Sequence, residues 1–105
     1  ASAKYSQLTL REEFARDSVT AEVRDAASAV QAAHMRAQLA MQEVAVALQL
    51  AELERERFQL GDSDLLRVNI REQQAVDAEL NLIAADLEYI RALMIYQQVT
   101  AQMLP

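Results

Sequence analysis

Apolar residues recur along both halves of the chain at alternating spacings of three and four. In the first half, one heptad position holds Val23, Val30, Ala37, Val44, Ala51 and Phe58, and the position three residues later holds Ala26, Ala33, Ala40 and Ala47. In the second half, the same two positions hold Val68, Ala75, Leu82, Tyr89, Tyr96 and Met103, and Ala78, Ala85, Ala92 and Val99. A heptad repeat sustained over this length predicts helices that supercoil around a partner in the left-handed sense. Both partners are present, so we expect an all-α fold, a long antiparallel two-helix coiled-coil hairpin.

Each half also carries a second apolar row outside this seam. Its members are Leu39, Val46, Leu53 and Leu60 in the first half and Leu66, Val76, Leu80, Ile83, Leu87, Ile90 and Met94 in the second. Two helices alone cannot cover this row, and a contiguous exposed apolar surface is typical of an interaction site. The sequence therefore predicts lateral neighbours, while the alanines of the seam predict a close approach of the two helix axes.

Capping residues predict where the helices begin and end. Thr9 and Glu12 match a capping box that would start the first helix near residue 10. Gly61 can adopt the left-handed conformation that closes a helix, and Asp62, Ser63 and Asp64 offer acceptors to the amides that open the next helix. We expect one hairpin over residues 1–105, with a helix over about 10–60, a turn at 61–63 and a helix over about 64–104. Folding about the turn places Leu104 beside Thr20, so residues before Thr20 should lack a partner in this chain.

Composition supports this fold and narrows the function classes. The chain has one Gly, one Pro and no Cys, which leaves few breaks and removes disulfides and thiolate metal sites. The net charge of -6 comes from interspersed charges without a basic stripe, so we expect no nucleic acid partner. No apolar run is long enough to span a bilayer. The chain begins at Ala without a signal pattern, and we expect a piece of a longer protein.

Residues that could carry chemistry have structural interpretations that fit better. His34 has no second histidine or cysteine at ligand spacing, and Glu52 and Glu56 alternate with arginines as on a solvated helix face. The methionines are scattered, and Tyr89 and Tyr96 lie on the seam. We therefore expect no catalytic residue, metal or cofactor, and a protein that is not an enzyme. The turn itself can be read as two helix caps or as a functional tip.

The residues around the turn follow a distinctive order, which is Glu56-Arg57-Phe58-Gln59-Leu60-Gly61-Asp62-Ser63-Asp64-Leu65-Leu66-Arg67-Val68-Asn69. A long helix ends in an aromatic residue, two further residues and Gly, and a Ser two residues on leads into a second helix rich in Ala, Gln and Glu. Upstream, Glu22-Val23-Arg24-Asp25-Ala26 matches a Glu-Val-x-x-Ala stretch. In these features, from Phe14 to Ala101, the chain resembles the outer-membrane efflux proteins of the TolC family.

The resemblance implies the periplasmic part of an outer-membrane protein of a Gram-negative cell envelope. In that family a homotrimer forms a barrel of helices to which each protomer contributes two hairpins. The hairpin tip docks to a periplasmic adaptor protein, which connects it to an inner-membrane transporter in a tripartite export system. By that match, Leu60, Gly61 and Asp62, supported by Ser63 and Asp64, would bind the adaptor. Members that close the pore with acidic residues have them where this chain has Arg67 and Ile70, so a constriction here would be basic or apolar.

Two other functions fit the same pattern. A structural or scaffolding coiled-coil hairpin without transport would need the same seams. The α-hairpin of a periplasmic adaptor protein is a further alternative, although the order from Phe58 to Gly61 fits the channel better. The segments that flank this one in a longer protein would discriminate between them, since a channel would add alternating amphipathic strands.

Overall fold

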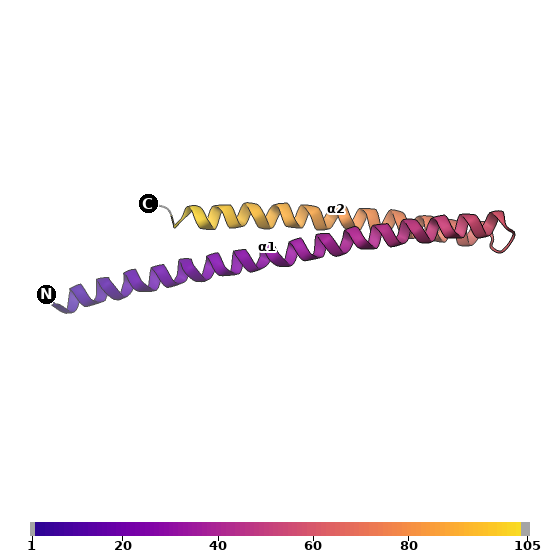
Figure 1. The fold of residues 1–105 in the computed structure, drawn as a ribbon. Coiled ribbons are helices and arrows are strands. Elements are labelled where there is room, and N and C mark those ends of the chain that lie inside the picture. The colour runs from indigo at the N-terminus through magenta and orange to yellow at the C-terminus, as the bar shows by residue number, and fades with distance from the viewer. Residues whose placement is uncertain (1, 104–105) are drawn as a thin grey trace. The chain divides into compact units, whose positions relative to one another are not determined.

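The computed structural model describes residues 2–103, and these residues form two helices and no strand. Helix α1 spans Ser2–Gln59 and helix α2 spans Leu65–Ala101, and the two are joined by residues 60–64 (Figure 1). This is an all-α helical hairpin, which confirms the predicted fold class. By its contacts the chain divides into two compact units. The turn unit is Ala33–Tyr89, and the terminal unit combines Ala1–Ala32 with Ile90–Pro105.

The core of the turn unit is a seam of small residues. The buried apolar residues are Ala33, Ala37, Ala40 and Ala51 on α1 and Val68, Ala75 and Ala85 on α2. Ala37, Ala40 and Ala85 form one cluster, and Leu82 packs against it. All of these are predicted seam positions, so the heptad repeat is confirmed here. Because alanine has no side chain beyond Cβ, this seam brings the two backbones close together.

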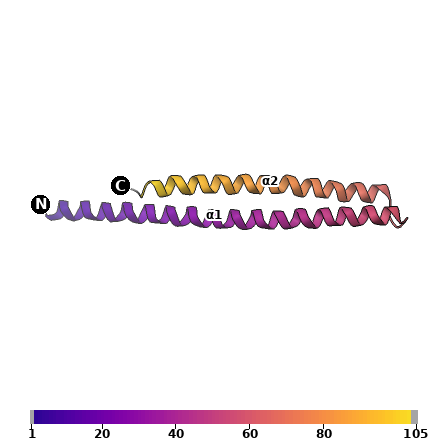
Figure 2. The same cartoon turned by 45° about the horizontal axis from the view of Figure 1, so that its top comes forward.

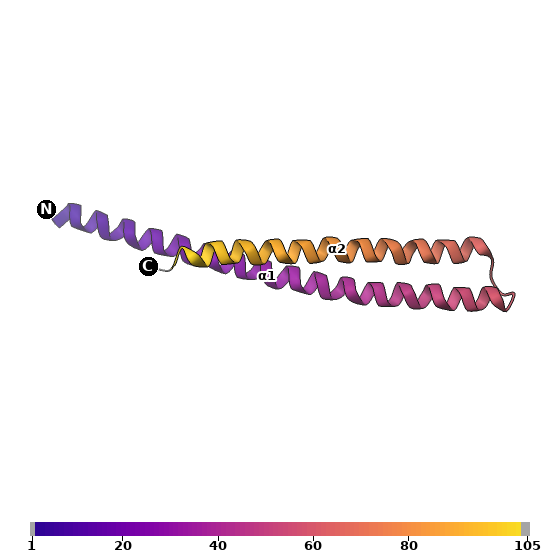
Figure 3. The same cartoon turned by 90° about the horizontal axis from the view of Figure 1, so that it is seen from above.

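Side-chain pairs across the turn unit fix the antiparallel pairing of the helices. The rings of His34 and Tyr89 meet edge to face with centroids 5.2 Å apart. Arg36 Nε lies 3.3 Å from Glu88 Oε2. Residues in the middle of α1 thus pair with residues late in α2, as an antiparallel hairpin requires. Figures 2 and 3 show the two helices alongside each other as they approach the turn.

The second apolar row is exposed along both helices. In the turn unit its exposed fractions run from 47% for Val76 to 77% for Leu60. The others in this unit are Leu39, Val46, Leu53, Leu66, Leu80, Ile83 and Leu87. Ile90 and Met94, in the terminal unit, are exposed as well. The hairpin leaves this row uncovered, as predicted.

The terminal unit continues the seam with fewer buried residues. Ala26 is buried, and Val23 and Val30 on α1 and Ala92, Tyr96 and Val99 on α2 are half-buried. Thr20 shares a surface hollow of about 440 Å³ with Gln102 and Met103, in line with the predicted position of Thr20 near the end of the chain. Leu104, the predicted neighbour of Thr20, lies outside the described residues. Residues 2–18 are all exposed, and of these Ala15 and Arg16 line the same hollow as Gln102 and Met103.

Three of the predicted boundaries differ from those in the structure. Helix α1 begins at Ser2 rather than near residue 10, because the Thr9 hydroxyl donates to the Tyr5 carbonyl (3.0 Å) within the helix and does not cap it. Helix α2 ends at Ala101 rather than near 104, and Gln102 and Met103 close it with bonds to carbonyls three residues back. The turn is longer than predicted, since five residues, 60–64, separate the helices.

The alanine seam yields a test of the fold. We expect Ala40→Leu to lower the free energy of unfolding by about 1–3 kcal/mol, because a larger side chain at a site only 2% exposed must push the helices apart. Urea denaturation followed by circular dichroism measures this change. Ala45→Leu is the matched control, since Ala45 is exposed on the same helix, and it should shift stability by less than about 0.5 kcal/mol. Equal effects of the two substitutions would contradict the seam.

Candidate functional site

The candidate site is the connection between the helices, residues 60–64, which we call the tip. Its first half is a Schellman motif. The Gly61 N–H donates to the Phe58 carbonyl (3.1 Å) and the Asp62 N–H donates to the Arg57 carbonyl (2.8 Å). This pair of bonds requires a left-handed residue, and Gly61 has a φ of 84°. The predicted role of Gly61 in closing α1 is confirmed.

The second half of the tip is the N-cap of α2. Asp64 Oδ1 accepts a hydrogen bond from the Arg67 N–H (2.8 Å), and the Asp64 carbonyl accepts the first helical bond from Val68 (3.2 Å). The Asp64 carboxylate also places a negative charge at the positive end of the helix dipole. This confirms the predicted capping role of Asp64. Ser63, predicted as a further capping acceptor, instead acts as a donor toward α1.

A buried carboxylate joins the tip to α1. Glu54 is 7% exposed, and each of its oxygens has a partner. Ser63 Oγ donates to Oε1 (3.0 Å), and Arg57 Nη1 donates to Oε2 (3.3 Å). Arg57 Nη2 also donates to the Asp62 carbonyl (3.3 Å). Two tip residues are therefore tied to the last turns of α1 by side-chain hydrogen bonds.

Glu54 was not among the predicted site residues, although the sequence carries a signal for it. It stands seven residues after Ala47, at the seam position that the heptad assigns to an apolar residue. Phe58, which was predicted on the seam, is 45% exposed. It lies in the last turn of α1, where the chain is already leaving the helix pair. A polar network, rather than an aromatic side chain, closes the seam at this end.

The tip residues themselves lie at the surface. Leu60 is 77% exposed, Gly61, Asp62 and Asp64 are exposed, and Ser63 is half-buried. No atom lies within 4 Å of the position that a Cβ on Gly61 would occupy. The five predicted residues are therefore together on one loop whose backbone is held at both ends by hydrogen bonds. Figure 3 shows this loop joining α1 to α2.

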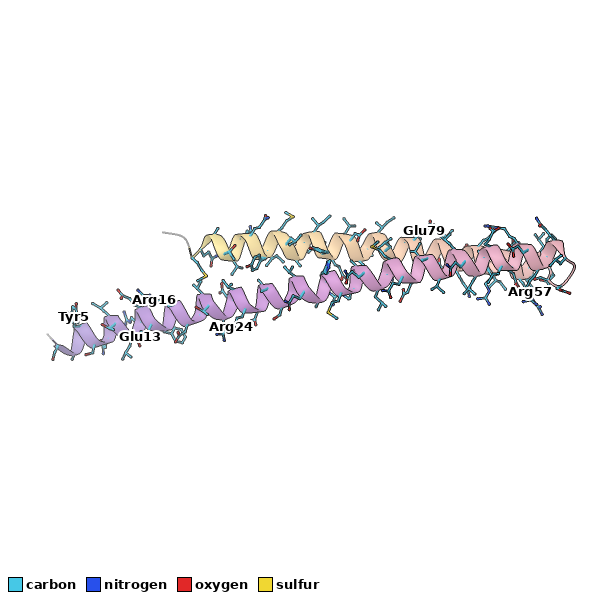
Figure 4. The ribbon with its side chains drawn as sticks, in the orientation of Figure 1. Tyr5, Glu13, Arg16, Arg24, Arg57 and Glu79 are labelled. Atoms are coloured by element: carbon cyan, nitrogen blue, oxygen red, sulfur yellow. The ribbon has the colours of Figure 1, made fainter. Side chains whose placement is uncertain are left out.

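A groove of about 400 Å³ lies beside the tip. It is lined by Glu54, Arg57, Arg67, Ile70, Arg71 and Gln74, and we call it the arginine groove. Arg67 and Ile70, the predicted constriction residues, thus share one surface feature. Figure 4 marks Arg57 on the last turns of α1.

Three further charged residues near the tip form ion pairs with one another. Arg55 lies between Glu52 (3.1 Å) and Glu72 (2.9 Å), and the hydrogen bond from Arg55 to Glu72 raises the pKa of the guanidinium. Solvent screens exposed pairs of this kind, so they add little to stability. Glu52 is therefore engaged in a surface ion pair, as the interpretation of a solvated face expects.

The described residues hold neither a cluster of metal ligands nor a membrane-spanning stretch. Among residues 2–103 there is no group of three or more His, Cys, Asp or Glu that could hold a metal ion. Within the same residues, neither helix has a stretch apolar enough, over a sufficient length, to cross a membrane. His34 packs on Tyr89, which fits its interpretation as a structural residue.

Comparison with known proteins assigns no function to the tip residues. No protein-family model, no curated protein and no solved structure matches this chain. The resemblance to the TolC family therefore depends on the order of residues around Gly61 and on the Glu22-Val23-Arg24-Asp25-Ala26 stretch, and it stays a prediction.

The link between Ser63 and Glu54 gives a test of how the tip is held. We expect Ser63→Ala to lower the free energy of unfolding by about 1–2 kcal/mol, because a largely buried carboxylate oxygen loses its hydrogen bond. Ser28→Ala is the control, since Ser28 is exposed in the interior of α1, and its effect should be close to zero. Chemical denaturation of both variants measures the difference. If the two variants are equally stable, the link does not hold the tip.

Proposed function

We propose that this chain is a periplasmic α-helical hairpin of an outer-membrane efflux channel of the TolC family, and that its tip docks to a periplasmic adaptor protein. The observation that carries the proposal is the tip itself. Leu60, Gly61 and Asp62 are exposed, and a Schellman motif and the Glu54 network hold them in one conformation. A loop that is ordered before binding loses less entropy on docking than a mobile one.

The exposed second row supports the channel over an isolated hairpin. In a barrel of helices each helix has a neighbour on two sides, and so requires two apolar seams. The seam of the turn unit buries alanines, while leucines and isoleucines remain outside. Neighbouring hairpins of a trimer would cover them. This chain would then be one hairpin of the channel, and the inner-membrane transporter would be reached through the adaptor.

Arg67 and Ile70 would take the position of the pore constriction. Arg67 is exposed over 60% of its side chain and Ile70 over 48% of its surface, so both are available to a neighbour or a pore. The constriction would then combine positive charge with an apolar residue, in place of an acidic ring.

A scaffolding hairpin is the second candidate, since the exposed row would equally serve a bundle without transport. The α-hairpin of an adaptor protein stays a third. A scaffolding hairpin gives the fixed, exposed Leu60-Gly61-Asp62 segment no role in docking, and the order from Phe58 to Gly61 fits the channel better than the adaptor.

The docking proposal predicts that bulk at the tip abolishes assembly. In the full-length protein we expect Gly61→Trp to abolish cross-linking between the tip and the adaptor, and to abolish efflux from whole cells. Gly61→Ala is the matched control, because both substitutions share the cost of a left-handed residue, about 1–2 kcal/mol, and differ only in bulk. The space around Gly61 is open, so the tryptophan itself should not unfold the hairpin. Efflux that survives Gly61→Trp would overturn the tip assignment.

The exposed row predicts self-association of the chain in isolation. We expect light scattering to show a mass above that of the 11.8 kDa monomer, increasing with concentration. Replacing Leu80, Ile83 and Leu87 by Gln should return the protein to a monomer without loss of helix, because these side chains are outside the seam. A wild-type chain that stays monomeric at high concentration would count against lateral packing.

A further inference from the structure

The arginine groove has a charge that differs from the rest of the molecule. The chain as a whole carries a net charge of -6. The groove is lined by three arginines and one carboxylate, Glu54. Arg57 and Arg67 expose 53% and 60% of their side chains. Positive charge is therefore concentrated on one side of the tip.

Glu54 offsets the charge of only one of the three arginines, Arg57, with which it forms an ion pair. It is buried, and both of its oxygens already accept hydrogen bonds, from Ser63 and from Arg57. Arg67 Nε forms a long ion pair with Asp64 Oδ2, at 3.9 Å, which leaves no hydrogen bond between them. Arg71 donates to the neutral amide of Gln74 (3.2 Å). Since each guanidinium has five N–H donors, Arg67 and Arg71 retain most of theirs for a ligand.

We propose that the arginine groove binds carboxylate side chains of the partner that docks at the tip. This inference rests on the proposed docking, and it assigns Arg67 and Ile70 to the docking interface in place of the pore constriction. The planar fork of a guanidinium matches the two oxygens of a carboxylate, and such pairs are among the stronger hydrogen bonds in proteins. Arg67 and Arg71 stand one helical turn apart on α2. Acidic residues one turn apart on a partner helix would meet them in register.

The surroundings favour an acidic protein segment over a phosphate polymer. Glu56, Asp62 and Asp64 lie beside the groove in sequence and are exposed, so an extended polyanion would meet repulsion on leaving it. Ile70 lines the groove between the two arginines in sequence and is 48% exposed. A helix that carries acidic side chains beside a leucine would satisfy both the charge and the apolar surface.

A peptide titration tests the groove independently of the adaptor. The probe is a short alanine-based helical peptide in which two glutamates one turn apart flank a leucine, and the matched peptide has glutamines. We expect the glutamate peptide to shift the arginine Nε–Hε NMR signals of Arg67 and Arg71 in the whole chain, with an affinity that falls as salt screens the charges. Equal shifts with the glutamine peptide would overturn the proposal. So would shifts with inorganic phosphate or a short DNA duplex that exceed those with the glutamate peptide.

Charge reversal then tests the role of the groove in docking. We expect Arg67→Glu with Arg71→Glu to weaken peptide binding by at least about tenfold, while Arg24→Glu with Arg91→Glu, the same change of net charge in the terminal unit, leaves it unchanged. The double variant Arg67→Gln with Arg71→Gln removes the two positive charges without adding negative ones. It should still weaken peptide binding, and it is less prone to misfold than the charge-reversed variant. Circular dichroism checks that all variants are helical. Undiminished binding by the folded groove variants would refute the proposal.

Cross-linking to the adaptor shows whether the groove inference fails alone or the proposed function fails as well. If Gly61→Trp abolishes adaptor cross-linking in the full-length protein and the groove variants do not weaken it, the tip docks but the groove is not part of the interface. If Gly61→Trp has no effect, the proposed function fails, whatever the peptide shows. We expect both sets of variants to reduce cross-linking, and an Asp or Glu to Arg change in the adaptor to restore it in the charge-reversed protein.

Discussion

Two helices can share only one seam, and this limit determines most of the structure. A residue is buried in a two-helix hairpin only if it lies on the line where the helices face each other. In the turn unit that line holds alanines, with Val68 as its largest buried apolar member. Small residues let the backbones approach, but they bury little apolar area each. The larger side chains, such as Leu80 and Ile83, have no place in the seam and lie on the outside. A chain with this pattern depends on neighbours for much of its burial.

The seam ends in a polar network near the turn. The heptad position of α1 after Ala47 is buried there, and the loop beside it supplies polar partners. Glu54 occupies that position, and it forms hydrogen bonds to both Ser63 and Arg57. A buried carboxylate costs free energy unless its oxygens are satisfied, so it favours the one loop conformation that satisfies them. The result is a tip whose backbone conformation is specified by side chains as well as by Gly61.

The repeating features of this fold were predictable from sequence, and the features that depend on a single three-dimensional arrangement were not. The heptads identified Ala37, Ala40 and Ala85 as core, and Gly61 and Asp64 as caps, because these assignments follow from periodicity and local chemistry. The predicted start of α1 near residue 10 was wrong. Thr9 and Glu12 match a capping pattern, but they lie inside a helix that begins at Ser2. Glu54 was missed since its partner, Ser63, is nine residues away across a turn whose geometry was unknown. Its place in the heptad was the signal that could have found it.

Some arginines near the turn are compensated within the hairpin and others are not. This difference would affect how a docked partner is oriented. Arg55 is held between Glu52 and Glu72, so its charge is compensated within the hairpin. Arg67 and Arg71 have no comparable partner among the described residues, since one faces a carboxylate at 3.9 Å and the other a neutral amide. A partner that met only the exposed backbone of Gly61 could rotate about the hairpin end. One that also carried acidic side chains would be restricted to the rotation that places them over the arginine groove.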